Sequence, residues 1–304
     1  MIGVTLIELD FSYALSLFFS YLLPLYEVRG LPSGDVEVEK VSGFARGLRC
    51  RSDALRSTCI IPQGYSLSDV RPLLGTEVRK HVEEFFALLK RFDFNFKLLS
   101  MFSLIYSPKD KQYVIAAVLL SQNTDYYSNT VRWVKTLING GIEALKLEKS
   151  YQVERFIDIY EEILKIVNTD LDIRDEVTEL LKIEGVSAKS VSAYLLHAYG
   201  ILSEAPVDRH FKELLEAAGL KFRQPDKDRC IKARFQHSLC QLRGRCVYGV
   251  VSSIFGSFSG VVQSAGYICG RILRGKFSSY IEEVLLHSIP LDKLEKECSL
   301  FKAA

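Results

Sequence analysis

A lysine and an aspartate that lie nineteen residues apart are the first residues in this sequence whose types favour chemistry. Lys189 follows the turn Gly185-Val186-Ser187 and falls in the first turn of an expected helix. The positive end of a helix dipole disfavours an ammonium ion there, which favours the neutral amine. A neutral lysine is a nucleophile that forms a Schiff base with a carbon such as C1′ of a sugar. Asp208 is expected to cap the next helix; taken singly, the two residues are also explained as a surface lysine and a cap.

Three cysteines and a histidine form a second group. Cys230, His237, Cys240 and Cys246 are separated by six, two and five residues. The sequence has seven cysteines, and its first residues lack the positive segment of a signal peptide, so we expect a reducing, intracellular compartment. Clustered thiols are then first interpreted as metal ligands, and this set suits zinc as well as an iron–sulfur cluster.

The elements that position these groups are expected to be mainly helical. The 304 residues are 48% hydrophobic and 25% charged, as in a soluble globular protein, and the net charge of +2 says little about partners. Short β-rich pieces occur up to residue 97, whereas helical periodicity dominates afterwards. We therefore predict an N-terminal α+β domain over residues 1–97 and a helical domain over residues 98–304. The last helices are able to return to either domain.

Residues 177–200 are expected to form two helices joined by a short hairpin. The first helix stops at Gly185, and Ser187 is the expected N-cap of the second. Backbone N–H groups at such a helix start bind phosphate without a basic side chain. Shape alone does not establish a contact with DNA, because most helix pairs of this kind bind nothing.

The pattern L-x-x-x-x-G-V-x-x-K, followed by V-D-x-H, resembles the helix-hairpin-helix-GPD superfamily of DNA base-excision glycosylases. The resemblance implies a mainly α helix-hairpin-helix glycosylase fold. It also implies that Lys189 attacks the sugar while Asp208 supports the departing base. A lysine at this position is typical of the bifunctional glycosylase/AP lyases, such as endonuclease III and 8-oxoguanine DNA glycosylase. His210 matches a histidine that lies near the DNA backbone, and Gly185, Val186 and Ser187 match the hairpin that contacts it.

A second match lies upstream, in LLSQNTDYYSN at 119–129. It places Gln122 where the family has a residue that fills the gap left by an extruded base. The hairpin departs from the family's L-P-G-V-G, because Glu184 brings a negative charge and Ser187 replaces a glycine. The alternative is therefore a non-catalytic paralogue that binds damaged DNA. Basic residues concentrated between 227 and 245 favour an acidic partner.

The spacing of Cys230, His237, Cys240 and Cys246 equals the C-x6-C-x2-C-x5-C spacing of the [4Fe–4S] loop in endonuclease III and its relatives, with histidine in second place. The resemblance implies an iron–sulfur cluster. Zinc, a loop without metal, and Cys269 as a fourth thiolate stay open.

The stretch 247–270 has no charged residue but holds five glycines and five serines, so we expect a helix or helix pair inside the protein rather than a membrane span. The expected partner is damaged double-stranded DNA, with no membrane. The protein is expected to be a monomer in the cytoplasm, associated with the nucleoid.

Overall fold

The computed structural model of the protein describes residues 5–90, 97–274, 277 and 279–303. The chain forms two compact units: unit 1 contains residues 1–110 and 264–304, and unit 2 contains residues 111–263. This division differs from a single boundary near residue 97, which adjoins residues outside the described part. The composition shift marks where strands stop, whereas the helices that follow still belong to the unit that holds the sheet.

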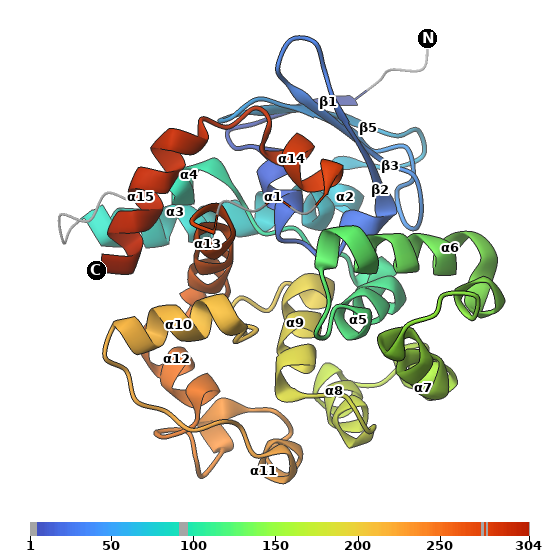
Figure 1. Ribbon diagram of the computed structural model, residues 1–304, viewed down its shortest axis with the longest axis vertical. Helices are drawn as coiled ribbons and strands as arrows, with labels where there is room; N and C mark the ends of the chain where they lie inside the picture. Colours follow the sequence, from blue (N-terminus) through green and yellow to red (C-terminus); the bar gives the residue numbers. More distant parts are fainter. Residues whose placement is uncertain (1–4, 91–96, 275–276, 278, 304) are drawn as a thin grey trace. The chain divides into compact units, whose positions relative to one another are not determined.

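Unit 1 is built on a five-stranded antiparallel sheet with the strand order β1-β5-β4-β3-β2 (Figure 1). Apolar and charged residues alternate in β3, where Val36 and Val38 are buried and Glu37 and Glu39 are half-buried on the opposite face. Helix α1 is buried along its length and packs against β3 and β4. The strands are β1 (Thr5–Leu9), β2 (Tyr26–Gly30), β3 (Val36–Lys40), β4 (Arg49–Ser52) and β5 (Ser57–Ile61). The helices that lie wholly in unit 1 are α1 (Tyr13–Phe18), α2 (Leu67–Leu74), α3 (Thr76–Lys90), α4 (Leu98–Met101), α14 (Tyr280–Leu286) and α15 (Leu291–Ala303).

Four of the seven cysteines form two disulfides in unit 1, although a reducing compartment was expected from the sequence. Cys50 and Cys59 are direct partners in the register of β4 and β5, and their Cα atoms lie 4.1 Å apart. Cys269 is bonded to Cys298, so it is not a fourth thiolate for the cysteine-rich loop. Spacing along the sequence does not reveal either pairing, because both depend on tertiary contacts.

Unit 2 is helical among its described residues. Its central helix α5 is apolar on all sides, as expected for a helix surrounded by others, and it packs against α6, α7 and α9. The helices are α5 (Lys111–Leu120), α6 (Val131–Leu145), α7 (Tyr151–Val167), α8 (Ile173–Lys182), α9 (Ala188–Tyr199), α10 (Arg209–Ala217), α11 (Lys227–Lys232) and α12 (Val247–Phe255). Helix α13 (Ser259–Ile272) carries the chain from unit 2 into unit 1. The expected fold class, mainly α with an N-terminal α+β part, is confirmed.

A buried polar cluster fixes the helices that hold the hairpin. The Glu176 carboxylate on α8 is fully buried and accepts hydrogen bonds from Lys111 Nζ at 2.6 Å, Tyr194 Oη at 2.5 Å and Tyr199 Oη at 2.8 Å. A buried carboxylate is tolerated when it is paired and hydrogen-bonded in this way. The cluster therefore ties α5, α8 and α9 together.

The uncharged stretch 247–270 forms a helix pair, α12 and most of α13, as expected. Among the described residues, no helix has the length and apolar character needed to cross a bilayer.

Candidate active site

The hairpin between α8 and α9 has the turn that its sequence predicts. Gly185 has φ of +83°, which a residue with a side chain rarely adopts, and a Cβ there would lie 2.6 Å from Arg155 Nη2. Val186 is buried, and its N–H donates to the Ile183 carbonyl at 3.3 Å. Ser187 is exposed in an extended conformation with φ of −111°, so serine is unstrained where the family has glycine. Its Oγ caps α9 by accepting the Ser190 N–H at 3.2 Å.

Lys189 is exposed in the first turn of α9, two residues beyond the Ser187 cap. Most of α9 is buried, and the cluster around Glu176 fixes this helix in place. Lys189 is exposed because it lies at the start of the helix. The lysine amine is therefore available to a ligand that binds beside the hairpin.

Asp208 is partly buried and caps α10, as the sequence predicts. Its Oδ1 accepts the Phe211 N–H at 2.8 Å, and its Oδ2 accepts a hydrogen bond from Gln263 Nε2 at 3.0 Å. Burial raises the pKa of the Asp208 carboxyl above its ordinary value of 3.8. The Phe211 N–H, the positive charge of Lys189 and the Gln263 amide oppose this rise without cancelling it.

Lys189 and Asp208 stand at the starts of successive helices, and the positive charge of Lys189 lowers the pKa of the Asp208 carboxyl. A carboxylate beside an amine is able to take a proton from it and to stabilise a positive charge that develops nearby. His210 is half-buried in the first turn of α10, and its backbone N–H also donates to Asp208.

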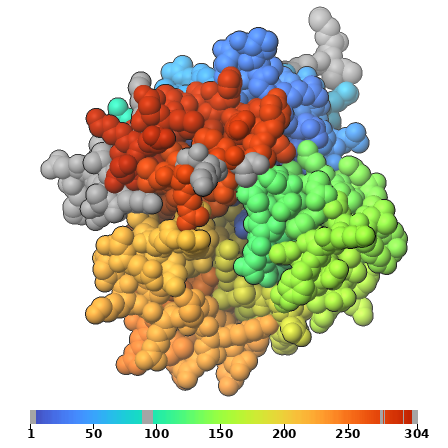
Figure 2. Space-filling view, viewed as in Figure 1, coloured from blue at the N-terminus to red at the C-terminus, as the bar shows by residue number. Residues whose placement is uncertain are grey.

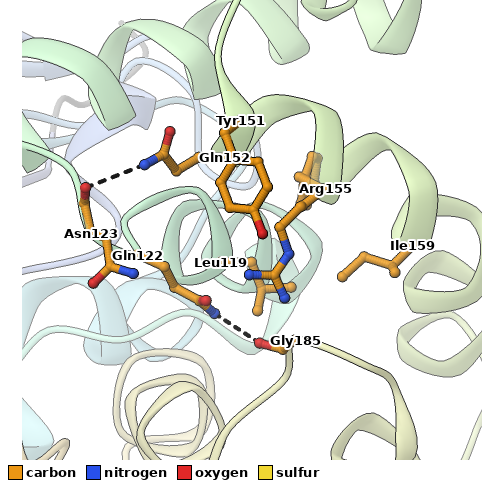
Figure 3. A pocket seen from close by; sticks show the side chains of 9 residues that line it. Leu119, Gln122, Asn123, Tyr151, Gln152, Arg155, Ile159 and Gly185 are labelled. Atoms are coloured by element: carbon orange, nitrogen blue, oxygen red, sulfur yellow. Dashed lines mark hydrogen bonds between the residues drawn. The ribbon is translucent and has the colours of Figure 1, made fainter.

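Gln122 follows α5 and joins it to the hairpin. Its Nε2 donates to the Gly185 carbonyl at 3.1 Å and to Ser190 Oγ at 3.2 Å. Figure 3 shows this side chain directed at the Gly185 carbonyl. In this conformation the Gln122 side chain supports the hairpin through hydrogen bonds. Its role in filling the gap left by an extruded base stays a prediction.

A small open pocket lies beside Gln122 (Figure 3). Sequence reasoning missed three residues that line it: Asn123, Tyr151 and Arg155. The Tyr151 ring is 66% exposed, and the Arg155 guanidinium lies over it at 5.5 Å. Asn123 has φ of +55°, and its carbonyl accepts a hydrogen bond from Gln152. An exposed aromatic ring beside a cation is suited to stacking on a nucleic-acid base, but nothing in the local sequence marked these residues.

The cysteine-rich loop, residues 230–246, contains three free thiols. Cys230, His237, Cys240 and Cys246 all line one pocket. Burial raises the pKa of the Cys230 thiol, and negative charge on Cys246 and Cys240 adds to the rise. Within the described part of the chain, however, no three His, Cys, Asp or Glu side chains are grouped as metal ligands.

His237 is held by a carboxylate instead of by the thiols. Its Nε2 lies 3.0 Å from Glu204 Oε2, and its ring stacks on Tyr248. Metal-bound histidines commonly use one ring nitrogen for the metal and hydrogen-bond a carboxylate through the other. The donor types suit a metal or a cluster and line one pocket, but the described side chains are not grouped as its ligands, so metal binding stays a prediction.

The segment around α11, drawn in orange in Figure 2, contains several basic residues. Lys232 and Arg245 are exposed and form no ion pair among the residues that the structure describes. Arg234 is paired with Asp175 at 2.5 Å, whereas Lys227 Nζ donates to the Ile183 carbonyl at 2.8 Å. The Lys227 contact sets a cation against the hairpin, where it offsets the exposed Glu184.

These features define a class of fold: a helical unit with a hairpin, an exposed lysine that begins its second helix and an aspartate that caps the next. The chain has the helix-hairpin-helix-GPD fold of DNA glycosylases, because solved structures of that class match it along most of its length.

One such structure is 8-oxoguanine glycosylase/lyase from Clostridium acetobutylicum in complex with double-stranded DNA containing cytosine opposite 8-oxoguanine. It is 13% identical, with 89% of this chain and 99% of that chain covered and a TM-score of 0.54. Its apo form matches with 13% identity, 89% and 98% coverage and a TM-score of 0.53. MBOgg1 in complex with a low-affinity DNA ligand is 14% identical, with 90% and 99% coverage and a TM-score of 0.57. No protein-family model matches the sequence. No curated protein matches it either.

Proposed function

We propose that this chain is a base-excision DNA glycosylase with an associated AP lyase activity, and that its substrate is damaged double-stranded DNA. One observation carries the proposal. An exposed lysine lies in the first turn of α9 and a partly buried aspartate caps the next helix, α10, in a helix-hairpin-helix-GPD fold. A DNA partner would place the protein in the cytoplasm, in association with the chromosome.

The damaged nucleotide would have to leave the base stack before it reaches these groups. Enzymes that act on a base inside a duplex extrude it, and the space that it leaves needs a filler. Gln122 and the exposed ring of Tyr151 border the pocket beside the hairpin and supply an amide and an aromatic surface for that purpose. The start of α9, with Ser187 and a helix dipole, would contact a phosphate of the same strand.

Asp208 would act first. As the bond between C1′ and the base breaks, the base leaves with the electron pair and positive charge develops at C1′ and the ring oxygen. The ionised Asp208 carboxylate stabilises this charge while it develops. Once the base has left, the carboxylate receives a proton from the Lys189 ammonium, which leaves the amine neutral. A raised pKa in Asp208 makes that proton transfer less unfavourable than it would be for an ordinary aspartate.

Lys189 would then form the covalent intermediate. The neutral amine attacks C1′, and a bond forms between Nζ and C1′. A proton passes from the nitrogen to the ring oxygen as the bond from C1′ to that oxygen breaks, which opens the sugar, leaves a hydroxyl group and gives the protonated imine. The imine acidifies the C2′ hydrogen. Loss of that proton to a base expels the 3′ phosphate with the electrons of its C–O bond, which cuts the strand.

The proposal includes the cysteine-rich loop as a metal-binding element. Cys230, Cys240, Cys246 and His237 would hold a [4Fe–4S] cluster, with zinc as the other metal that suits them. The group would supply structural rigidity to the loop and take no part in bond cleavage. Iron, zinc and sulfide contents of anaerobically purified protein, with the absorbance near 400 nm, decide between these groups and a loop without metal.

The activity is tested with a panel of duplexes that carry 8-oxoguanine, an oxidised pyrimidine, an alkylated base or an abasic site. Release of one modified base, together with cleavage of the abasic duplex, supports the bifunctional enzyme. Tight binding to damaged duplexes without any cleavage would contradict it and would favour the non-catalytic paralogue. Binding that is independent of salt would argue against a DNA partner altogether, because phosphate contacts release counterions.

A further inference from the structure

The uncharged stretch that begins α13 brings one polar side chain to Asp208. Gln263 is 6% exposed, and its Nε2 donates to Asp208 Oδ2 at 3.0 Å. The two residues are 55 positions apart in the sequence. Gln263 is surrounded in the sequence by glycines and serines, and it is the residue of this stretch that carries a side-chain amide.

A close approach of α13 to the segment before Asp208 makes this contact possible. The Gly260 N–H donates to the Leu202 carbonyl at 2.8 Å. A Cβ on Gly260 would lie 2.7 Å from Leu196 Cδ1 and 3.0 Å from the Glu204 carbonyl oxygen. A larger residue would therefore push α13 away, and Gln263 lies one helical turn beyond this glycine. The small residues of the stretch thus have a structural purpose that its composition alone did not reveal.

Gln263 completes the immobilisation of the carboxylate. Phe211 N–H holds Oδ1 at 2.8 Å while Gln263 holds Oδ2, so rotation of the carboxyl group would break at least one hydrogen bond. The donor from α13 is a neutral amide. An amide fixes an acceptor without a full charge of its own, whereas a lysine or arginine there would compete with Lys189 for the same carboxylate. Lys189 on α9 is a charged side chain that acts on Asp208, and α10 contributes the backbone N–H groups of His210 and Phe211.

We propose that Gln263 is a positioning residue of the active site, which holds the Asp208 carboxylate ionised and oriented toward Lys189. The proposal rests on the proposed function. Gln263 itself need touch neither the base nor the sugar, and it acts through Asp208. Its role predicts a specific signature: loss of the amide donor impairs the step that needs ionised Asp208, with little change in the affinity for DNA.

The test compares Gln263→Met, which keeps the length of the side chain and removes the donor, with Gln263→Glu, which faces Asp208 with a second acid. Single-turnover cleavage of an abasic duplex is followed as a function of pH, alongside binding of a duplex that contains a non-cleavable abasic analogue. Gln263→Met is expected to slow cleavage by up to about 100-fold, since misplacement of a catalytic group has effects of that size. The acidic limb of its pH profile moves to higher pH, and Gln263→Glu moves the limb further.

Ser259→Ala is the matched control, because Ser259 Oγ bonds to the Gly256 carbonyl at the start of the same helix and does not reach Asp208. It is expected to lower thermal stability with the pH profile unchanged. The pKa of Asp208, measured by carboxyl carbon NMR without DNA, gives a readout that is independent of activity and is expected to rise in Gln263→Met. Equal rates, pH profiles and Asp208 pKa values in wild type and Gln263→Met would overturn the role of Gln263 alone. A wild-type protein that cleaves no duplex would overturn the proposed function and this inference with it.

Discussion

Replacement of Asp208 by asparagine or by alanine separates its role as a helix cap from its role as an acid. Asparagine caps a helix as well as aspartate does, so Asp208→Asn keeps the hydrogen bond from the Phe211 N–H. The Gln263 side-chain amide is able to flip, so that its oxygen accepts a hydrogen bond from the NH2 group of the new asparagine. Asp208→Ala loses the cap, which costs about 1 kcal/mol, and leaves the buried Gln263 N–H unpaired, which costs a further ~1–3 kcal/mol.

The two variants are therefore expected to fail equally in cleavage but to differ in stability. Each loses about 100-fold or more in single-turnover rate, because neither has a carboxylate. A loss of about 2–4 kcal/mol lowers Tm by roughly 5–15 °C for a unit of this size, so Asp208→Ala melts well below the wild type. Asp208→Asn melts at the wild-type temperature or above it at neutral pH.

The pH dependence of this difference follows from the raised pKa of Asp208. The folded protein holds the Asp208 proton more tightly than the unfolded chain does, so ionisation of this group costs stability as the pH rises above 3.8 through the folded-state pKa. Relative to wild type, the asparagine variant is thus equal near pH 4 and gains at neutral pH. Urea unfolding between pH 4.5 and 8 measures the gain. A loss in Asp208→Asn as large as that in Asp208→Ala would refute the reasoning.

Two further predictions concern backbone and covalent constraints. Gly185→Ala forces a side chain into φ of +83° against Arg155, so it is expected to lower the free energy of unfolding by about 1–2 kcal/mol and to weaken DNA binding. Gly244→Ala is the control, because open space surrounds Gly244, and it is expected to leave stability and DNA binding unchanged. Calorimetry measures the stability, and a binding titration measures the affinity for DNA. Cys298→Ser removes the Cys269–Cys298 disulfide, which closes a loop with a sequence separation of 29. It is expected to lower the free energy of unfolding by about 3–4 kcal/mol. A urea midpoint equal to that of the wild type under non-reducing conditions would speak against a bond in solution.

Local signals carried most of what the sequence predicted about the hairpin. Ser187 and Asp208 each act as the cap of their own helix, and Gly185 supplies the positive φ that ends the first one. Each of these features depends on four or five neighbouring residues, so the sequence contains the whole cause. The same holds for the mainly helical fold with a small N-terminal sheet.

The features that the sequence did not predict depend on tertiary contacts. Gln263 meets Asp208 because Gly260 lets α13 approach, and no local pattern links residues so far apart. The partner of Cys269 was unknowable for the same reason. Gln122 was expected to face DNA, yet its amide lies in hydrogen-bond contact with the hairpin, a partner that sequence position alone did not indicate.

Covalent trapping tests the central claim, that Lys189 is the nucleophile, most directly. The wild-type protein, Lys189→Gln and Lys165→Gln, which alters an exposed lysine in the last turn of α7, are each incubated with an abasic duplex and borohydride. Reduction of the imine is expected to give a stable protein–DNA adduct with the wild type and the Lys165 variant, with the linkage mapped to Lys189 by mass spectrometry. Lys189→Gln is expected to give none while it still folds and binds the duplex. An adduct that survives in Lys189→Gln would contradict the account.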